Sequence, residues 1–509
     1  MFKIHPRHAG TALGATFMTA GLWLVFMLYR EGHLWLALAG LALLAGSAAI
    51  FSMKRAYALR YLYPGAAAIL VFVILPALYT VGIGFTNYSS SNLLSYERAT
   101  SYLLEQTYAG DGDPLRLQLY RQNSQYRLTL SRDDGAAWRS APIKLNAIQP
   151  ASQKLALQAT AGQNTGEKLA LKDVIALQPA LRQLTLTLPG QTTPYRLSSL
   201  SGFSPAKPLY LRQADGALLN QQSGETLRPD FERGFYRNAQ GENIVPGFRV
   251  NVGWKNFRQL FANSDLQKPM LKVFAWTVTF SALTVLFTFA LGLMLATVLS
   301  WEALRFRGVY RVLLFLPYAV PGFISILIFR GLFNENFGEI NLVLNGLFGI
   351  RPSWFSDPLL AKAMLLIVNT WLGYPYMMLL CLGLIKSIPS DLYEASAING
   401  ASAWTNLTQI TLPLILKPIM PLLIASFAFN FNNFVLISLL TDGRPDFIDS
   451  AVPAGTTDIL VSYTYRIAFQ DSGQNFGLAA AISTLIFALV AALSLINLRL
   501  SRINAQANR

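Results

Sequence analysis

The chain has 509 residues, of which 53% are hydrophobic and only 13% are charged. A soluble domain carries roughly 25% charged residues, so this composition excludes an ordinary soluble protein. The formal net charge is +15, but the basic residues are scattered, with no zinc-ligand spacing or RNA-binding aromatic motif. We therefore predict no nucleic-acid partner.

Eight long stretches lack Asp, Glu, Lys and Arg altogether and are rich in aliphatic residues. They cover 11–29, 33–51, 61–86, 273–300, 312–329, 363–385, 418–440 and 478–498. About 20 apolar residues span the hydrocarbon core of a bilayer, so the sequence predicts eight transmembrane helices in a lipid bilayer. The first stretch is interpreted as a retained span, because no clear cleavage site separates it from the second.

The short loops indicate the orientation of these spans. With the N-terminus in the cytoplasm, the inner segments 1–10, 52–60, 301–311, 386–417 and 499–509 hold 13 Lys and Arg. The short outer segments 30–32, 330–362 and 441–477 hold 6. Because positive charge accumulates on the cytoplasmic side, we predict a multi-pass protein with both termini inside.

Residues 87–270, between the third and fourth spans, are too many for an unstructured connection. Apolar and polar residues alternate there, as at Leu115, Leu117 and Leu119, and turn signals such as Asp134-Gly135 separate the runs. This period of two predicts a β-rich domain on the outer face. The domain is either a docking surface for an extracytoplasmic partner or a scaffold without a ligand.

The predicted fold is thus an all-α polytopic membrane protein with eight transmembrane helices and a β-rich periplasmic domain inserted between helices three and four. Residues 1–86 form three membrane helices, 87–270 form the periplasmic domain, and 271–509 form a core of five membrane helices.

The fifth and sixth spans contain residues that weaken helices. Pro317-Tyr318 and Pro321-Gly322 lie in the fifth, and Trp371-Leu-Gly-Tyr-Pro-Tyr376 lies in the sixth. Gly373 and Pro375 should loosen the sixth helix, and transporters often place substrate at such breaks. Trp371 and Tyr376 would then line a site; the alternative is that these rings pack against neighbouring helices.

The cytoplasmic loop 388–413 carries the most specific motif. Pro389 and Ser390 begin a predicted helix that ends at a glycine, and a second short helix is expected from around Ser402 to Pro413. Glu394, flanked by small residues, suits a groove on another protein. The alternative is an ordinary amphipathic surface loop.

Glu394-Ala395-Ser396, Gly400 and Ile410-Thr-Leu-Pro413, at this spacing, resemble the coupling loop of binding-protein-dependent ABC importer permeases. The number of spans, the outer insertion and Phe427–Phe434 resemble the larger membrane subunit of maltose/maltodextrin importers. The resemblance implies that Glu394, Ala395, Ser396 and Gly400 couple the chain to an ATPase. It also implies a bacterial inner (cytoplasmic) membrane protein.

The seventh span carries a polar stripe. Ser426, Phe429, Asn430 and Asn433 fall on one face of a helix, and amides facing lipid would be costly. They either join packed helices or contact a sugar, whose hydroxyls amides can bind and whose C–H face an aromatic ring can cover.

The resemblance implies sugar contacts at nine residues: Tyr318, Trp371, Leu372, Gly373, Tyr376, Ser426, Phe429, Asn430 and Asn433. Gly322 departs from the pattern, because a close relative has serine there. A hydroxyl contact is then lost or replaced by water.

We expect a permease subunit of an ATP-driven maltose/maltodextrin importer, with no catalytic residue, metal or cofactor of its own. The sequence contains no Gly-Lys dipeptide and so no phosphate-binding Walker A loop. ATP and Mg would belong to an ATPase homodimer, and a smaller permease subunit and a periplasmic sugar-binding protein would complete the assembly. The alternatives are an ion-coupled secondary sugar transporter, which would usually need an acid in the membrane, and a membrane-protein insertase, which would need a charged groove.

Overall fold

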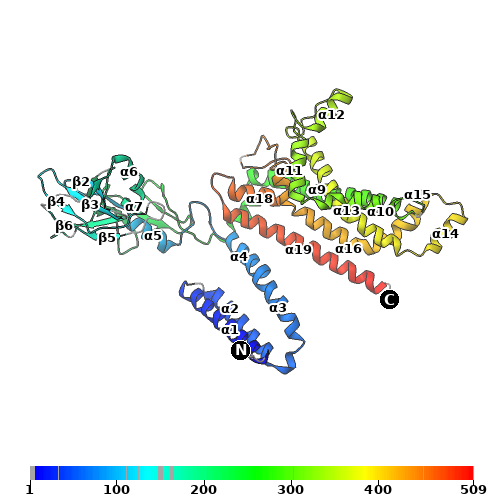
Figure 1. The fold of residues 1–509 in the computed structure, drawn as a ribbon, viewed down its shortest axis with the longest axis horizontal. Coiled ribbons are helices and arrows are strands. Elements are labelled where there is room, and N and C mark those ends of the chain that lie inside the picture. The colour runs from blue at the N-terminus through cyan, green and yellow to red at the C-terminus, as the bar shows by residue number, and fades with distance from the viewer. Residues whose placement is uncertain are drawn as a thin grey trace. The chain divides into compact units, whose positions relative to one another are not determined.

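The computed structural model describes residues 6–507 except 33, 111, 123–124, 147–152, 161–165, 192, 201, 302 and 451. The chain forms two compact units, one from Met1–Phe85 and Gly253–Arg509 and the other from Thr86–Val252 (Figure 1). In the described residues the first unit is helical and the second contains the strands. The description all-α therefore fits the first unit but not the whole chain.

The first unit contains the helices expected to meet the membrane. In chain order they are α1 (Pro6–Arg30), α2 (Leu34–Ser52), η1 (Lys54–Ala56), α3 (Leu59–Ile69), η2 (Leu70–Ile74), α4 (Leu75–Gly84), α8 (Lys255–Ala262), α9 (Ser264–Ser300), α10 (Arg307–Phe315), η3 (Leu316–Ala319), α11 (Gly322–Leu332), α12 (Glu339–Phe348), α13 (Pro358–Lys386), α14 (Ser390–Ile398), α15 (Ala403–Thr405), η4 (Asn406–Thr411), α16 (Leu412–Phe431), α17 (Phe434–Leu440), α18 (Leu460–Phe469) and α19 (Phe476–Ala507).

Among the described residues, five helices are long and apolar enough to cross a membrane. They are Leu34–Ser52, Leu59–Gly84, Ser264–Ser300, Pro358–Lys386 and Ala403–Phe431. A sixth candidate is the pair Arg307–Ala319 and Gly322–Leu332, which is bent by 88°. Helices α1 and α19 occupy the first and last predicted spans but are not among these candidates, so the structure supports a multi-helix membrane unit without establishing eight spans.

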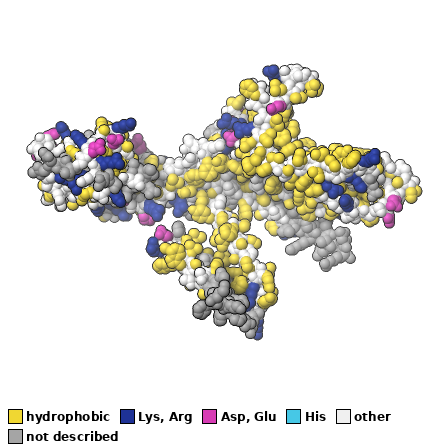
Figure 2. All heavy atoms as spheres, in the orientation of Figure 1, with side chains coloured by type: hydrophobic (Ala, Val, Ile, Leu, Met, Phe, Trp, Pro, Cys, Tyr) yellow, Lys and Arg dark blue, Asp and Glu magenta, His cyan; other side chains and the backbone are white. Residues whose placement is uncertain are grey.

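Large apolar side chains cover much of the surface of this unit (Figure 2). Trp35 is 82% exposed and Phe72 is 78% exposed. A surface of this kind would be unfavourable in water and is suited to lipid or to other apolar helices.

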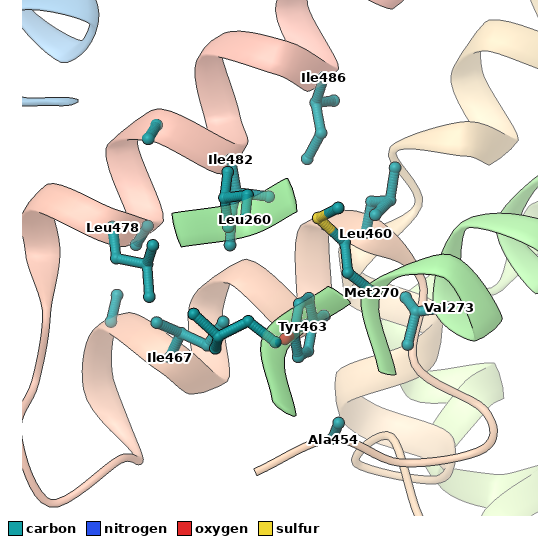
Figure 3. Packing of buried hydrophobic residues seen from close by; sticks show 14 of the residues in the cluster. Leu260, Met270, Val273, Ala454, Leu460, Tyr463, Ile467, Leu478, Ile482 and Ile486 are labelled. Atoms are coloured by element: carbon teal, nitrogen blue, oxygen red, sulfur yellow. The ribbon is translucent and has the colours of Figure 1, made fainter. Parts of the chain in front are cut away.

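A buried cluster joins the segment that follows the inserted domain to the end of the chain. Side chains from α8, the beginning of α9, α18 and α19 converge in it (Figure 3). Nδ2 of buried Asn256 on α8 also donates to the carbonyl of Gly84 at the end of α4, at 2.9 Å. The segment 253–270 therefore packs as part of the helical unit, whereas the sequence-based boundary placed it in the inserted domain.

An ion-pair network organises the segment between α17 and α18. Arg466 lies 2.9 Å from the carboxylate of Asp458, whose side chain is fully buried, and 2.7 Å from that of Asp446. Asp458 also accepts from the hydroxyl of Ser462 and the backbone N–H of Gly455, each at 2.7 Å. Burial raises the pKa of Asp458, while the guanidinium and the hydrogen bonds act in the opposite direction.

The second unit contains two β-sheets in its described residues. The larger sheet runs β5-β8-β9-β10-β2-β3-β4-β6, with β1 paired to β10 and β7 to β2, and the smaller runs β11-β12-β13-β14-β15. The elements are α5 (Tyr96–Leu104), β1 (Thr107–Ala109), β2 (Leu115–Gln122), β3 (Gln125–Ser131), β4 (Ala137–Arg139), β5 (Gln153–Ala156), β6 (Gln158–Ala159), β7 (Glu167–Lys168), α6 (Leu171–Ala176), α7 (Gln178–Arg182), β8 (Leu184–Thr187), β9 (Tyr195–Leu197), β10 (Gly202–Pro208), β11 (Tyr210–Arg212), β12 (Leu218–Asn220), β13 (Thr226–Asp230), β14 (Phe235–Arg237) and β15 (Asn243–Ile244).

The alternating pattern in the sequence produces the hairpin β2–β3. Leu117 pairs with Leu130 and Leu119 with Leu128, and all four side chains are buried on one face. The turn that follows β3 forms at Asp134-Gly135, where Gly135 has a φ of 90° and Oδ1 of Asp134 accepts from the N–H of Ala136. The predicted β-rich character of this insertion is confirmed.

Candidate functional site: a neutral cavity and a coupling helix

A cavity of 790 Å³ lies among six elements of the helical unit. Eight of the nine residues that the resemblance assigned to sugar contact line it: Tyr318, Leu372, Gly373, Tyr376, Ser426, Phe429, Asn430 and Asn433. The lining residues are all uncharged. The volume falls within the roughly 300–1,000 Å³ of small-molecule sites, so the cavity can hold a neutral polar ligand.

A sharp break in the fifth predicted span forms one wall. Helix α10 passes into the short 3-10 helix η3, and Pro321 lies immediately before α11. This break exposes 51% of Tyr318, whose ring stacks on Phe315 with centroids 5.1 Å apart. A methyl group added to Gly322 would meet no described atom within 4 Å, so this position has room for a larger side chain.

Helix α13 also lines the cavity, and it lacks the break that the sequence predicts. It begins at the cap Asp357, which accepts from two backbone N–H groups, and runs unbroken to Lys386 although Pro375 lies inside it. The ring of Trp371 packs edge-on against Phe329 with centroids 5.0 Å apart and is not among the residues that line the cavity. The prediction that Gly373 and Pro375 loosen this helix is therefore wrong.

Glycines bring α13 close to α9. A Cβ at Gly373 would lie 2.8 Å from Cγ2 of Thr288, and one at Gly292 would lie 2.7 Å from the backbone nitrogen of Met378. Small residues allow this close approach, as in other membrane helix pairs. Gly373 therefore serves the packing of two helices as well as lining the cavity.

The polar stripe of the seventh predicted span lies at a second break. Helix α16 ends at Phe431, and Asn433 caps the next helix, α17, by accepting from the N–H of Leu436 at 3.4 Å. The span predicted over 418–440 therefore ends early, at Phe431, and Phe434–Leu440 form a separate helix. Phe429 is 71% exposed, whereas Asn430 is only 5% exposed.

The sequence interpretation missed a polar residue of α13 that bonds to this stripe. Asn369 on α13 is 6% exposed and bonds to Thr284, Asn430 and Asn433. Thr284 and Asn369 also line the cavity. Asn369 lies one helical turn before Gly373, so its position inside an uncharged span was the signal that could have found it.

The loop 388–413 contains the predicted helix, α14. Its first turn contains Asp391, and Gly400 follows its end with a φ of 70°, a conformation that glycine adopts without strain. Glu394 and Ala395 are exposed, and Ile398 is 87% exposed. The helix thus presents a mixed apolar and acidic surface.

Side-chain hydrogen bonds tie α14 to the next helix. The hydroxyl of Ser396 donates to Oδ1 of Asn406, and the hydroxyls of Tyr393 and Thr411 lie 2.9 Å apart. The segment from Ala403 to Phe431 is one helix that includes the π-helical turn η4. The helix expected from around Ser402 to Pro413 begins where predicted, with Ser402 as its N-cap, but it continues through Pro413 to Phe431.

Comparison with known proteins covers both units. Residues 94–253 match the family described as the maltose transport system permease protein MalF P2 domain, and residues 288–505 match the binding-protein-dependent transport system inner membrane component. The maltose/maltodextrin transport system permease protein MalF of Vibrio cholerae is 51% identical over 97% of this chain and 94% of its own length. The protein of the same description from Escherichia coli strain K12 is 50% identical over 94% of each chain. A solved bacterial ABC transporter involved in alginate import is 24% identical, with a TM-score of 0.43, over 49% of this chain and 83% of its own.

Proposed function

Since the chain belongs to the MalF family of maltose/maltodextrin transport system permease proteins, we propose that its neutral cavity is the site through which maltose or maltodextrin crosses the membrane. The observation that supports this use is the lining. An exposed aromatic ring, Phe429, lies beside amide and hydroxyl groups in a cavity without charged side chains. Such a lining suits a sugar, because hydroxyls need both donors and acceptors while the C–H face of a pyranose packs on an aromatic ring.

We also propose that the chain crosses the membrane eight times, with both termini in the cytoplasm. The distribution of Lys and Arg in the short loops supports the orientation, and helices α1 and α19 provide the first and last spans. The β-rich unit Thr86–Val252 then lies in the periplasm, where it would meet a sugar-binding protein.

The other partners are a smaller permease subunit and an ATPase homodimer that binds ATP and Mg. Helix α14 is the ATPase contact, through Glu394, Ala395, Ser396 and Gly400. Its exposed surface and its hydrogen bonds to the 403–431 helix support this role. Movement of α14 would pass along that helix to Asn430 at its far end.

Purification of the chain with its partners and reconstitution into lipid vesicles would test the function. Maltose uptake should require ATP, the ATPase subunits and the sugar-loaded binding protein together. Uptake that continues without the ATPase would favour an ion-coupled secondary transporter instead. Trp371 can be tested in the same assay, where its contact with sugar remains a prediction from the family resemblance.

A further inference from the structure

A continuous series of hydrogen bonds crosses the break between α16 and α17. Nδ2 of Asn430 donates to the backbone carbonyl of Ser426 at 2.8 Å, and Oδ1 of Asn430 accepts from Nδ2 of Asn369 at 2.7 Å. Oδ1 of Asn369 accepts from Nδ2 of Asn433 at 3.4 Å, and Oδ1 of Asn433 accepts from the N–H of Leu436 at 3.4 Å. Three side-chain amides thus connect two backbone groups.

The two backbone groups determine how every amide in the series is oriented. The carbonyl of Ser426 can only accept, so Asn430 must turn its NH₂ group toward it and its oxygen toward Asn369. The N–H of Leu436 can only donate, so Asn433 must turn its oxygen toward it and its NH₂ group toward Asn369. Asn369 can satisfy both neighbours in one orientation only, and aligned hydrogen bonds of this kind strengthen one another.

Asn369 itself has little capacity left for a ligand. One N–H of its NH₂ group bonds to Asn430 and the other bonds to Oγ1 of Thr284 at 3.2 Å. Its side chain is buried, at 6% exposure. In contrast, Asn430 and Asn433 each retain one N–H and one acceptor lone pair beyond these bonds, and both line the cavity.

We propose that Asn369 is a positioning residue of the sugar site, which orients the amides of Asn430 and Asn433 so that each presents one donor and one acceptor to a sugar hydroxyl. This inference rests on the proposed function of the cavity. It assigns to Asn369 a role that acts through its two neighbours and not through contact with the sugar.

The test uses the complete transporter in vesicles, with maltose, ATP and the binding protein. Asn369→Leu keeps a similar volume but removes all three hydrogen bonds, so maximal maltose uptake per assembled complex should fall about tenfold. The half-saturating concentration of maltose-loaded binding protein should not change, because docking at the outer face does not involve Asn369. Ser281→Ala is the matched control: this buried hydroxyl on α9 donates to the carbonyl of Thr277 on its own helix, and its loss should leave uptake intact.

A double-mutant cycle separates positioning from general stability. If Asn369 acts through Asn430, then Asn369→Leu combined with Asn430→Ala should transport no worse than Asn430→Ala alone. If the double variant loses uptake by the product of the two single losses, the positioning role is overturned. The same holds if Asn369→Leu takes up maltose normally while Asn430→Ala is impaired. If Asn430→Ala and Asn433→Ala both transport normally, the proposed sugar site fails and the positioning role fails with it. Where Asn369→Leu does not assemble, Asn369→Ser, which is too short to bridge both amides, enters the same cycle.

Discussion

The hydroxyl groups of Tyr393 and Thr411 lie 2.9 Å apart and connect helix α14 to the helix that reaches the cavity. Thr411 is only 3% exposed, so water cannot readily replace this bond. Because a helix is stiff along its axis, the contact offers a direct path from α14 to Asn430. The strength of this contact should therefore influence how well ATP hydrolysis responds to sugar.

We expect Tyr393→Phe to reduce maltose-stimulated ATP hydrolysis about threefold, because it removes one part-buried hydrogen bond and keeps the aromatic ring. The ratio of stimulated to basal hydrolysis in vesicles measures the effect. Thr408→Val is a suitable control, since the hydroxyl of Thr408 donates only to the carbonyl of Trp404 on the same helix among the bonds that the structure describes. An unchanged ratio in Tyr393→Phe would show that this contact does not transmit movement.

Glu394 lies on the exposed surface of α14, where reversal of its charge would act on a partner and not on the fold. Glu394→Lys should abolish maltose-stimulated ATP hydrolysis, because the proposed function places Glu394 in the contact with the ATPase and lysine reverses its charge. Co-purification of the ATPase shows whether docking itself is lost. Intact coupling in this variant would rule out Glu394 as part of the contact.

Phe429 and Phe431 lie two residues apart but in opposite environments, since Phe429 is 71% exposed in the cavity and Phe431 is fully buried in the cluster around α18 and α19. Phe429→Ala should abolish maltose transport while the complex still assembles, because the proposed function places this ring against the sugar. Phe431→Ala should instead destabilise the unit, by about 3 kcal/mol. Loss of assembly in Phe429→Ala would support a packing role for its ring.

The helices that form the site can be predicted from the sequence, but not every position at which they break. Charge-free stretches located the apolar helices, and the 388–413 motif predicted α14, because both depend on residues close together in the chain. Pro413 was interpreted as a helix end, yet the helix continues through it. The π-helical turn η4 lies just before Pro413, and the changed hydrogen-bond spacing accommodates a residue that has no N–H to donate.

The role of Asn369 could not be predicted from local pattern. Its neighbours Thr284 and Asn430 are 85 and 61 residues away in the chain, and only the packing of α9, α13 and α16 brings them together. Asn433 was expected on the same helical face as Asn430. It reaches the same cavity instead as the cap of α17, because the helix ends between them.

Gly322 and Gly292 should respond in opposite ways to a larger side chain. Gly322→Ser should assemble normally and change maltose uptake by a few-fold, because the position has open space and the added hydroxyl would face the cavity. Gly292→Ala should reduce the assembled complex, because its methyl group would press on the backbone of Met378 at 2.7 Å. Equal assembly of the two variants, measured by size-exclusion chromatography, would contradict this packing.

The guanidinium of Arg466 neutralises the buried carboxylate of Asp458. Removing Arg466 alone should therefore lower the free energy of unfolding by more than the ion pair itself contributes. Arg466→Met would leave Asp458, which has no exposed side-chain surface, without its counter-charge, and we expect a loss of about 3–5 kcal/mol. Adding Asp458→Asn should recover part of this loss, because the amide can still accept from Ser462 without carrying charge. Thermal unfolding of the purified complex measures both steps. A double variant less stable than Arg466→Met would mean that hydrogen bonding of Asp458, and not its unpaired charge, dominates the stability of this segment.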